Sequence, residues 1–306
     1  MKNVSEIISS KAGTDEILNK LEQLPGTELN SILLELFVRR TQTISPNDVL
    51  TQFDQNRFTT PSTIDVIAFK QMELQWLQLA ATKKFKPVQL SPLAPLGTCS
   101  TFKTVHQNNI VSATRATEVM SDATNVFALL AAQHYKKTNS YTPVKYVTAE
   151  RLVRAQGLAH PGHSAHFGIF CMASAGFNTG SFLFEMEQLT EHLSLHLELL
   201  SSFNKEDLSI KILLKEKNEA LRVAIQSAIK NISESYSTEI IHQQDPNNYY
   251  GLVQFKTFLN YKGKEINLSD GGFVDWTQQL LSNKKHRLLI SGIGIELVFK
   301  ILTGVI

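Results

Sequence analysis

Two segments near the C-terminus, GGFVDWTQQLL (residues 271–281) and HRLLISGIGIELVFKIL (residues 286–302), determine the fold prediction. The second predicts an apolar strand that runs into Gly292 and Gly294 and continues directly as an apolar helix. Because glycine has no side chain, a ligand or another backbone can approach such a strand closely. The glycine pair alone is more typical of packing or of a β-bulge, so the rest of the chain has to support a functional interpretation.

Composition sets the broad class of the protein. The 306 residues are 42% hydrophobic, enough for a large core, and the length suggests about two domains. The chain has 30 basic and 28 acidic residues and no long basic run, which argues against a dedicated nucleic-acid surface. Cys99 and Cys171 have no metal-ligand spacing and are expected to be buried free thiols. With neither a signal peptide nor an apolar run of ~20 residues, we expect a cytoplasmic protein.

The chain divides into two expected parts. Residues 1–60 predict a small helical N-terminal unit from the patterns TDEILNKLEQL, ELNSILLELFVRR and SPNDVLTQF. Residues 61–306 are expected to form the main domain, which opens with a long helix (residues 62–84) and a strand that ends in prolines. The helix has an apolar face that needs a partner surface, formed by Val66, Phe69, Leu74, Leu77 and Ala81.

A polar turn follows between two apolar elements. The sequence predicts a strand through Ile110 and Val111, then the turn, then a helix capped by Ser121 or Asp122. The turn collects Arg115, Thr117, Glu118, Asp122 and Thr124. A carboxylate and a hydroxyl are the groups that a buried ammonium requires, although a capped helix with a solvated turn explains the same residues.

Residues 144–156 and 166–176 predict two antiparallel strands joined by a loop. The first strand ends in Arg154, whose guanidinium group suits phosphate or carboxylate, and Gln156. The loop contains His160, His163 and His166, but their spacing matches no established metal site, so we expect a polar loop.

Residues 181–200 predict a strand that bends into an amphipathic helix. Glu185 and Glu187 would lie on one face of the strand, where they could bind Mg²⁺ or an amine, or form a salt bridge with Arg151 or Arg154. Residues 201–244 are rich in charge and predict a strand and a helix with a solvated face.

The order of these elements resembles the catalytic core of histidyl-tRNA synthetases, which are class II synthetases. The motifs GG-x-x-D, helix and G-x-G-x-E end that core, and the resemblance runs from about residue 65 to 302. It implies an α+β fold with a mainly antiparallel sheet flanked by helices, and a dimer interface at the helix after residue 61. It implies that residues 201–244 are an insertion between motifs 2 and 3.

The resemblance also assigns roles to individual residues. Arg154 matches the arginine that binds the α-phosphate of ATP, and Gln156 stands where the family has a glutamate that contacts adenine. Glu118 and Thr124 match residues that hold the substrate ammonium group, and Glu185 and Glu187 stand near the family's D-x-E.

Other positions depart from the family. Tyr249 and Tyr250 match a histidyl-specific signature, but Asp245 stands in place of its substrate-activating arginine. Leu297 replaces the motif 3 arginine that binds the distal phosphates of ATP. The sequence ends after the core, without a match to the family's anticodon-binding domain.

These departures argue against a tRNA-charging enzyme. The leading hypothesis is a paralogue that binds an amino acid or similar small ligand as a regulatory or binding subunit, similar to the regulatory subunit of ATP phosphoribosyltransferase. An ATP-dependent ligase that adenylates a carboxylate is the alternative, and a structural dimer with a vestigial pocket is a third. We expect a homodimer with a protein partner, without tRNA or membrane binding. The sequence leaves open whether ATP and Mg²⁺ bind.

The candidate ligand-binding residues come from six separate segments. They are Arg115, Glu118, Thr124, Arg154, Gln156, Glu185, Glu187, Tyr250, Gly271, Gly272, Gly292 and Gly294. Two arginines and three glutamates of this set can be buried at low cost only if they face one another or a zwitterionic ligand. We therefore predict that Arg115, Glu118, Arg154, Glu185 and Glu187 converge on one pocket beside the strand with Gly292 and Gly294.

Overall fold

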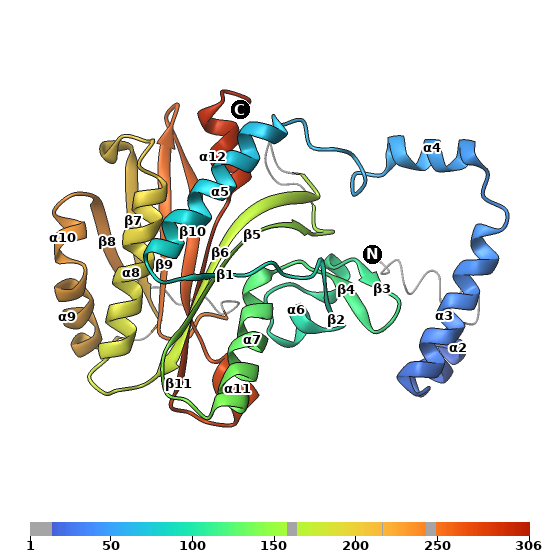
Figure 1. The fold of residues 1–306 in the computed structure, drawn as a ribbon, viewed down its shortest axis with the longest axis horizontal. Coiled ribbons are helices and arrows are strands. Elements are labelled where there is room, and N and C mark those ends of the chain that lie inside the picture. Colours follow the sequence, from blue (N-terminus) through green and yellow to red (C-terminus); the bar gives the residue numbers. More distant parts are fainter. Residues whose placement is uncertain (1–13, 158–163, 216, 243–248) are drawn as a thin grey trace.

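The computed structural model describes residues 14–157, 164–215, 217–242 and 249–306. In this part of the chain, a mixed, mainly antiparallel sheet of eight strands forms the centre of the molecule, in the order β1-β5-β6-β11-β10-β9-β7-β8 (Figure 1). Its strands are β1 (Lys86–Pro87), β5 (Val144–Val153), β6 (His166–Phe177), β7 (Leu208–Leu214), β8 (Ser237–His242), β9 (Val253–Tyr261), β10 (Lys264–Val274) and β11 (His286–Ile293). The β1–β5 and β7–β8 pairs are parallel. This is the predicted α+β class.

Helices cover both faces of the sheet. They are α5 (Val66–Thr82), α7 (Ala123–Thr138), α8 (Leu183–Leu199), α9 (Glu219–Ala228), α10 (Lys230–Ser233), α11 (Trp276–Leu281) and α12 (Ile295–Leu302). Strand β6 shows how the faces divide, because successive side chains of a strand point to opposite sides. Phe170 and Met172 pack in one core with α5, α8 and α12, and Cys171 and Ala173 pack in another with α7 and α11.

Helix α8 is joined to the sheet by a buried hydrogen-bond network. His192 contacts the hydroxyls of Ser174 at 2.9 Å and Ser291 at 2.8 Å, and His196 contacts those of Ser291 at 3.0 Å and Ser269 at 3.1 Å. Burial lowers the pKa of both imidazoles, to about 3 for His196. Both rings are therefore neutral at physiological pH, and a neutral imidazole can donate at one nitrogen and accept at the other.

A small second sheet lies beside α7 and corrects the predicted polar turn. It consists of β2 (Leu93–Pro95), β3 (Ser112–Ala113) and β4 (Thr117–Val119), with the short helix α6 (Thr98–Thr101) after β2. Arg115 and Ala116, at φ of 63° and 53°, form the turn between β3 and β4. Glu118 therefore lies in a strand and not in a loop. The predicted cap is confirmed, since the Asp122 carboxylate accepts from the Thr124 amide at 2.9 Å.

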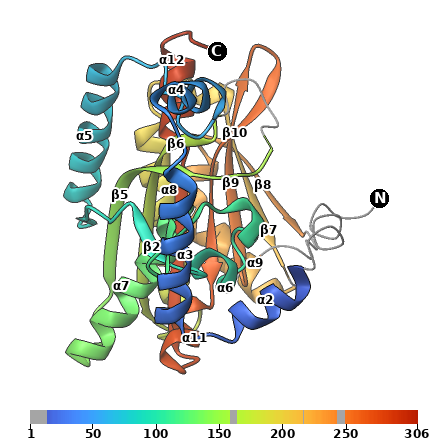
Figure 2. The same cartoon turned by 90° about the vertical axis from the view of Figure 1, so that its right-hand side faces the viewer.

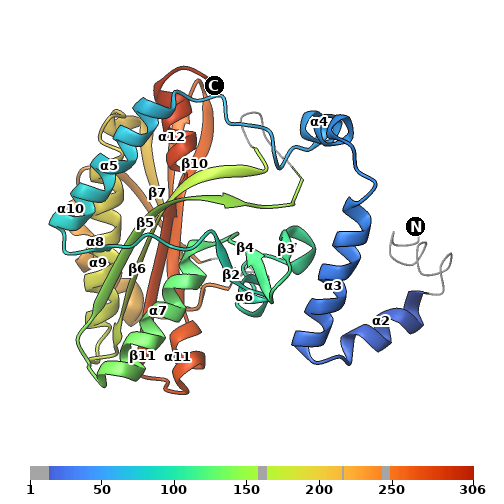
Figure 3. The same ribbon diagram turned by 45° about the vertical axis from the view of Figure 1, so that its right-hand side comes forward.

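The described N-terminal residues form three helices, as predicted: α2 (Thr14–Glu22), α3 (Gly26–Thr41) and α4 (Pro46–Gln55). Ser45 and Asp48 form a reciprocal capping box at the start of α4. We call residues 14–55 the N-terminal arm, which stands apart from the main sheet (Figures 1 and 3), although it lies in front of the sheet when the molecule is seen from the arm's side (Figure 2). In the described chain, no helix combines the length and the apolarity needed to cross a bilayer. The division into domains at residue 60 remains a prediction.

The predicted apolar face of α5 is split between two environments. Phe69 is buried and stacks edge-on against Phe299 at 5.4 Å, and Leu77 packs against the same core. Val66 and Leu74 are more than half exposed, at 57% and 56%, and Ala81 is exposed as well. The prediction of one face was therefore wrong: α5 packs one side on its own domain and leaves other apolar residues at the surface.

The predicted strand at residues 181–187 is also wrong. Helix α8 begins at Leu183, so Glu185 and Glu187 lie two positions apart on a helix and point to different sides. The segment 201–244 contributes β7 and β8, and β7 pairs with β9 at the edge of the main sheet. Its role as an insertion remains a prediction from the resemblance.

Candidate functional site

A pocket of about 280 Å³ opens where the ends of β5 and β6 meet β10, β11 and α12. It brings together four of the predicted site residues, namely Arg154, Gln156, Gly292 and Gly294. Its other lining residues include Phe167, Gly168, Asn267, Ser269, Asp270, Glu296, Leu297 and Lys300. The pocket therefore combines an apolar wall with two acidic, two basic and two amide side chains, as ligand sites do.

Arg154 is held in place by the segment before α7 and by strand β6. Its Nε donates to the Ser121 carbonyl at 2.9 Å, and its guanidinium carbon lies 5.4 Å from the ring centroid of Phe167. The distance from Nη2 to the Asp122 carboxylate is 3.8 Å, too long for a strong hydrogen bond. The side chain is three-quarters buried. An oriented, partly desolvated guanidinium with Nη atoms weakly engaged is suited to bind a carboxylate or a phosphate.

Asp270 is the acidic counterpart of Arg154 in this pocket. It lies on β10 opposite Lys256 of β9, and it accepts a hydrogen bond from the Tyr250 hydroxyl. Burial raises the pKa of Asp270, and Asp122 raises it further, against the opposing effects of Lys256, Tyr250 and Arg154. A carboxylate whose ionisation is disfavoured gains from a ligand cation placed beside it.

A second charged cluster closes the α12 side of the pocket. The Glu296 carboxylate contacts Arg151 at 2.8 Å, Lys300 at 2.9 Å, the Gly168 amide at 2.9 Å and the Ser62 hydroxyl at 3.1 Å. Burial opposes ionisation of Glu296, but the bonds from Lys300 and Gly168 and the charge of Arg151 outweigh it, so the pKa is lowered. Lys300 is therefore paired with Glu296 within the protein, whereas the Nη atoms of Arg154 are more available to a ligand.

The segment after the arm runs along the rim of the pocket. Arg57 donates to the carbonyls of Gln156 at 2.9 Å and Ala155 at 2.7 Å. The Thr60 carbonyl contacts His166 Nε2 at 2.6 Å. These contacts join residues about one hundred positions apart and fix the end of β5 that carries Arg154. We call residues 57–62 the strap.

The four predicted glycines serve two different purposes. A Cβ at Gly271 would lie 2.7 Å from the Ile290 carbonyl, and one at Gly272 would lie 2.6 Å from the Val253 carbonyl. Both glycines permit close strand packing and do not line the pocket. At Gly292 the nearest atom is the flexible Ile169 methyl at 3.2 Å, and at Gly294 it is Leu297 Cβ at 3.4 Å. These two glycines do line the pocket.

The predicted convergence of five charged side chains is wrong. Glu118 is fully buried, and its carboxylate accepts from the amides of Gly97 at 2.7 Å and Cys99 at 3.1 Å at the start of α6. It is a structural cap, because buried backbone amides need an acceptor. Arg115 lies exposed in the β3–β4 turn, where its backbone amide donates to the Asn30 side chain. The Thr124 hydroxyl bonds to Asp122 at 2.6 Å within the α7 cap.

Glu185 and Glu187 also lie elsewhere. Glu185 pairs with Arg287 of β11 at 2.7 Å, so the salt-bridge alternative was right in kind, although the partner is neither Arg151 nor Arg154. Glu187 is exposed on α8. Neither residue lines the pocket.

Tyr250, and Leu297 as a position that departs from the family pattern, both lie at the pocket. Tyr250 is buried under the pocket, packs on Gly272 and bonds to Asp270. Leu297 lines the pocket, which is where the resemblance places the motif 3 arginine. Asp245 lies outside the described residues.

The described residues hold no group of three or more His, Cys, Asp or Glu side chains arranged to bind a metal ion. His166 contacts Arg151 at 2.7 Å and Thr60, and so has a structural role. His160 and His163 lie outside the described residues.

Sequence reasoning missed Asp270, Glu296 with Lys300, and Arg57. The sequence does contain indications of the first two sites. Asp270 is an acidic residue within an otherwise apolar strand segment, and Glu296 and Lys300 are an i,i+4 pair of opposite charges within an apolar helix. The contacts of Arg57 depend on a chain crossing 99 residues away and have no local signature.

No family model and no curated protein matches the sequence. Solved structures match its fold. Histidyl-tRNA synthetase from S. aureus has a TM-score of 0.61 and 14% identity, over 80% of this chain and 68% of that one. The ATP phosphoribosyltransferase regulatory subunit/histidyl-tRNA synthetase from Bacillus halodurans has a TM-score of 0.61 and 13% identity, over 79% and 81%. A histidine–tRNA ligase subunit from Alicyclobacillus acidocaldarius has a TM-score of 0.56 and 11% identity, over 80% and 96%.

The matches cover most of the chain, including the eight-stranded sheet and its flanking helices. This chain therefore has the fold of the class II aminoacyl-tRNA synthetase catalytic core, and its structural neighbours include histidyl-tRNA synthetases and a regulatory subunit of ATP phosphoribosyltransferase.

Proposed function

We propose that this chain binds an amino acid or a similar small zwitterion in the pocket and acts as a regulatory or binding subunit. The observation that carries the proposal is that Arg154 and Asp270, of opposite charge, line the same pocket. The carboxylate of the ligand would bind Arg154 and its ammonium group would bind Asp270. Arg154 and Asp270 would then each contact an opposite charge on the ligand, which compensates them better than their protein surroundings do. This pair replaces the glutamates that the sequence had suggested for the ammonium group.

The pocket fits a small ligand better than a nucleotide triphosphate. Its volume of about 280 Å³ lies just below the range of ~300–1,000 Å³ that is typical of ligand sites. Leu297 supplies no charge at the wall where a distal phosphate would lie, and Lys300 is paired with Glu296 at 2.9 Å. Whether ATP and Mg²⁺ enter is therefore part of the test.

The regulatory role rests on two observations. The pocket has Leu297 and Gln156 where the resemblance places an arginine and a glutamate that bind ATP. One structural neighbour is described as an ATP phosphoribosyltransferase regulatory subunit/histidyl-tRNA synthetase. By analogy we propose a cytoplasmic homodimer with a protein partner and without tRNA charging. The exposed apolar residues of α5, Val66, Ile67 and Leu74, are the surface proposed for association of two copies.

A thermal-shift screen of the twenty amino acids, with and without MgATP, tests this function. A ligand at 100 times its dissociation constant stabilises the folded state by about 2.7 kcal/mol. Stabilisation by one amino acid without nucleotide supports the proposal. Stabilisation only with MgATP supports the ligase, and none with any combination leaves a structural protein with a vestigial pocket.

The ligase alternative makes a separate prediction. Because the pocket offers Leu297 and Gln156 where the resemblance places an arginine and a glutamate, we expect no detectable amino-acid-dependent exchange of pyrophosphate into ATP. A bona fide histidyl-tRNA synthetase in the same assay is the positive control. Robust exchange would establish the ligase and remove the regulatory assignment.

Ligand affinity should depend on the ionisation of Asp270. A ligand ammonium group favours the carboxylate form, so affinity is full above the raised pKa of Asp270 in the free protein and falls as the pH drops through it. Calorimetric titrations from neutral to mildly acidic pH should show this loss. Asp270→Asn should bind weakly and with a flatter pH profile, whereas an unchanged profile in this variant would exclude Asp270 as the ammonium ligand.

A further inference from the structure

The N-terminal arm exposes more apolar surface than an isolated structure can support. None of the residues in α2, α3 and α4 is buried. Large apolar side chains between 38% and 57% exposed run along it, namely Ile17, Leu18, Ile32, Leu36, Phe37, Val38, Ile44, Val49, Leu50 and Phe53. Helices of 9 to 16 residues are marginal in water without a packing partner. Apolar side chains exposed in this number along three neighbouring helices indicate an interaction site.

The apolar residues of the arm form stripes of helical spacing. On α3, Ile32 and Leu36 are four residues apart, and on α4, Val49 and Phe53 have the same spacing. Acidic residues accompany these stripes: residues 14–55 contain seven acidic and three basic residues, whereas the remaining chain contains 21 acidic and 27 basic residues. The arm is thus acidic and the body that follows it is basic.

The body of the same copy does not cover these stripes. The described contacts near the arm are the Asn30 side chain with the Arg115 amide, and the strap, where Arg57 binds two carbonyls. Both are polar contacts, and the strap fixes where the chain leaves the body. Two views of the molecule show the arm extended beside the body and not folded on α5 (Figures 1 and 3).

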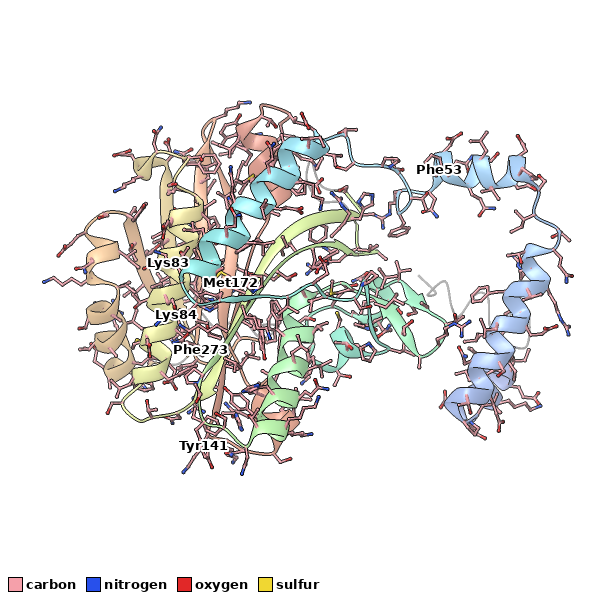
Figure 4. The ribbon with its side chains drawn as sticks, in the orientation of Figure 1. Phe53, Lys83, Lys84, Tyr141, Met172 and Phe273 are labelled. Atoms are coloured by element: carbon pink, nitrogen blue, oxygen red, sulfur yellow. The ribbon has the colours of Figure 1, made fainter. Side chains whose placement is uncertain are left out.

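The α5 surface has the complementary character. Ile67 is 71% exposed and Leu74 is 56% exposed, and Val66 lies beside them at 57%. Exposed lysines continue this surface past the end of the helix: Lys83 and Lys84 lie at the turn after α5 and Lys86 begins β1 (Figure 4). An apolar centre with a basic end matches an apolar stripe flanked by acids.

We propose that the apolar stripes of the arm in one copy pack on the α5 surface of a second copy, with Lys84 and Lys86 facing the acidic residues of the arm. The arm then reaches across between copies, and its helices gain the packing partner that they lack in a single chain. This inference extends the proposed self-association by naming both surfaces, and it does not depend on the ligand pocket.

Sedimentation velocity of the full chain tests the surface. The variant Leu36→Gln/Phe53→Gln should weaken self-association at least about tenfold and leave a folded chain, because both side chains are exposed in the single copy. The matched control Leu183→Gln/Val223→Gln changes two side chains of similar exposure, 63% and 54%, away from the arm and from α5, and should have no effect. Association should also weaken as salt is added.

Cross-linking identifies the partner surface. A copy with Phe53→Cys is mixed with a differently tagged copy with Leu74→Cys and treated with a short bismaleimide. Native Cys99 and Cys171 are buried, and burial raises the pKa of Cys99 to about 12, so background reaction is slow. We expect a mixed cross-linked product, absent when Val223→Cys replaces Phe53→Cys.

Three results would overturn the inference. If the variant Leu36→Gln/Phe53→Gln dimerises as strongly as the unmodified chain, the arm is not part of the interface. The proposed homodimer itself would then still hold. A dimer without the mixed cross-link would exclude α5 as the surface that receives the arm. A chain that is monomeric at every concentration would mean that a different protein covers the arm.

Discussion

Arg154→Ala is expected to reduce ligand-induced stabilisation by about half or more at a ligand concentration 100 times the original dissociation constant. The guanidinium is the charged donor that the pocket offers to a ligand carboxylate, and a hydrogen bond to a charged group contributes about 1.5 to 3 kcal/mol, or roughly a 10- to 150-fold change in affinity. Folding should be affected little, since the variant loses one bond to the Ser121 carbonyl and the contact with the Phe167 ring.

Arg115→Ala is the matched control for this variant. Arg115 was predicted at the same site, but it lies exposed in the β3–β4 turn and does not line the pocket. It should bind ligand as the unmodified chain does. Arg154→Lys keeps the positive charge but lacks the paired donors of a planar guanidinium group, so it should recover only part of the affinity. Equal losses in Arg115→Ala and Arg154→Ala would contradict the assignment of the pocket.

Glu296→Ala is expected to lower the free energy of unfolding by about 3 to 5 kcal/mol. The change removes the acceptor of four groups, among them Lys300, whose side chain is 10% exposed and contacts Glu296 at 2.9 Å. Because the folded pKa of Glu296 is lowered, its contribution is full above the unfolded pKa and is lost only as the pH falls through the folded one.

Urea denaturation measures this effect against Glu265→Ala. Glu265 pairs with Lys211 at 2.6 Å on the surface, where an ion pair contributes about 0 to 1 kcal/mol. The double variant Glu296→Met/Lys300→Met should recover much of the stability, because it replaces both charges of the buried Glu296–Lys300 pair with apolar side chains of similar length. A loss below about 1 kcal/mol in Glu296→Ala would show that the cluster does not hold α12 to β6.

The sequence predicted the elements that depend on local pattern. The strand patterns of β5 and β6, and the change from strand to helix at Gly294, are set by the residues of one segment. The structure has strands and a helix there, as predicted. Arg154 was found because it stands where the resemblance to motif 2 places a phosphate-binding arginine, and a guanidinium group suits that role.

Other features depend on which segments meet in space, and local pattern does not record that. Glu185 and Arg287 are 102 residues apart, and the pairing places Glu185 away from the pocket. Glu118 is satisfied by amides of α6, a four-residue helix without periodicity of its own. The strand predicted at residues 181–187 failed because the alternating apolar residues there occupy the first turn of α8.

The most direct test of the proposed pocket is hydrogen–deuterium exchange of the full chain with and without the amino acid that stabilises it. The proposal predicts that ligand protection concentrates in peptides covering residues 152–157, 267–272 and 291–297, which contain Arg154, Asp270 and Gly292. Protection concentrated instead in α5, or in residues 135–141 at the far end of α7, or no protection at ligand saturation, would contradict it.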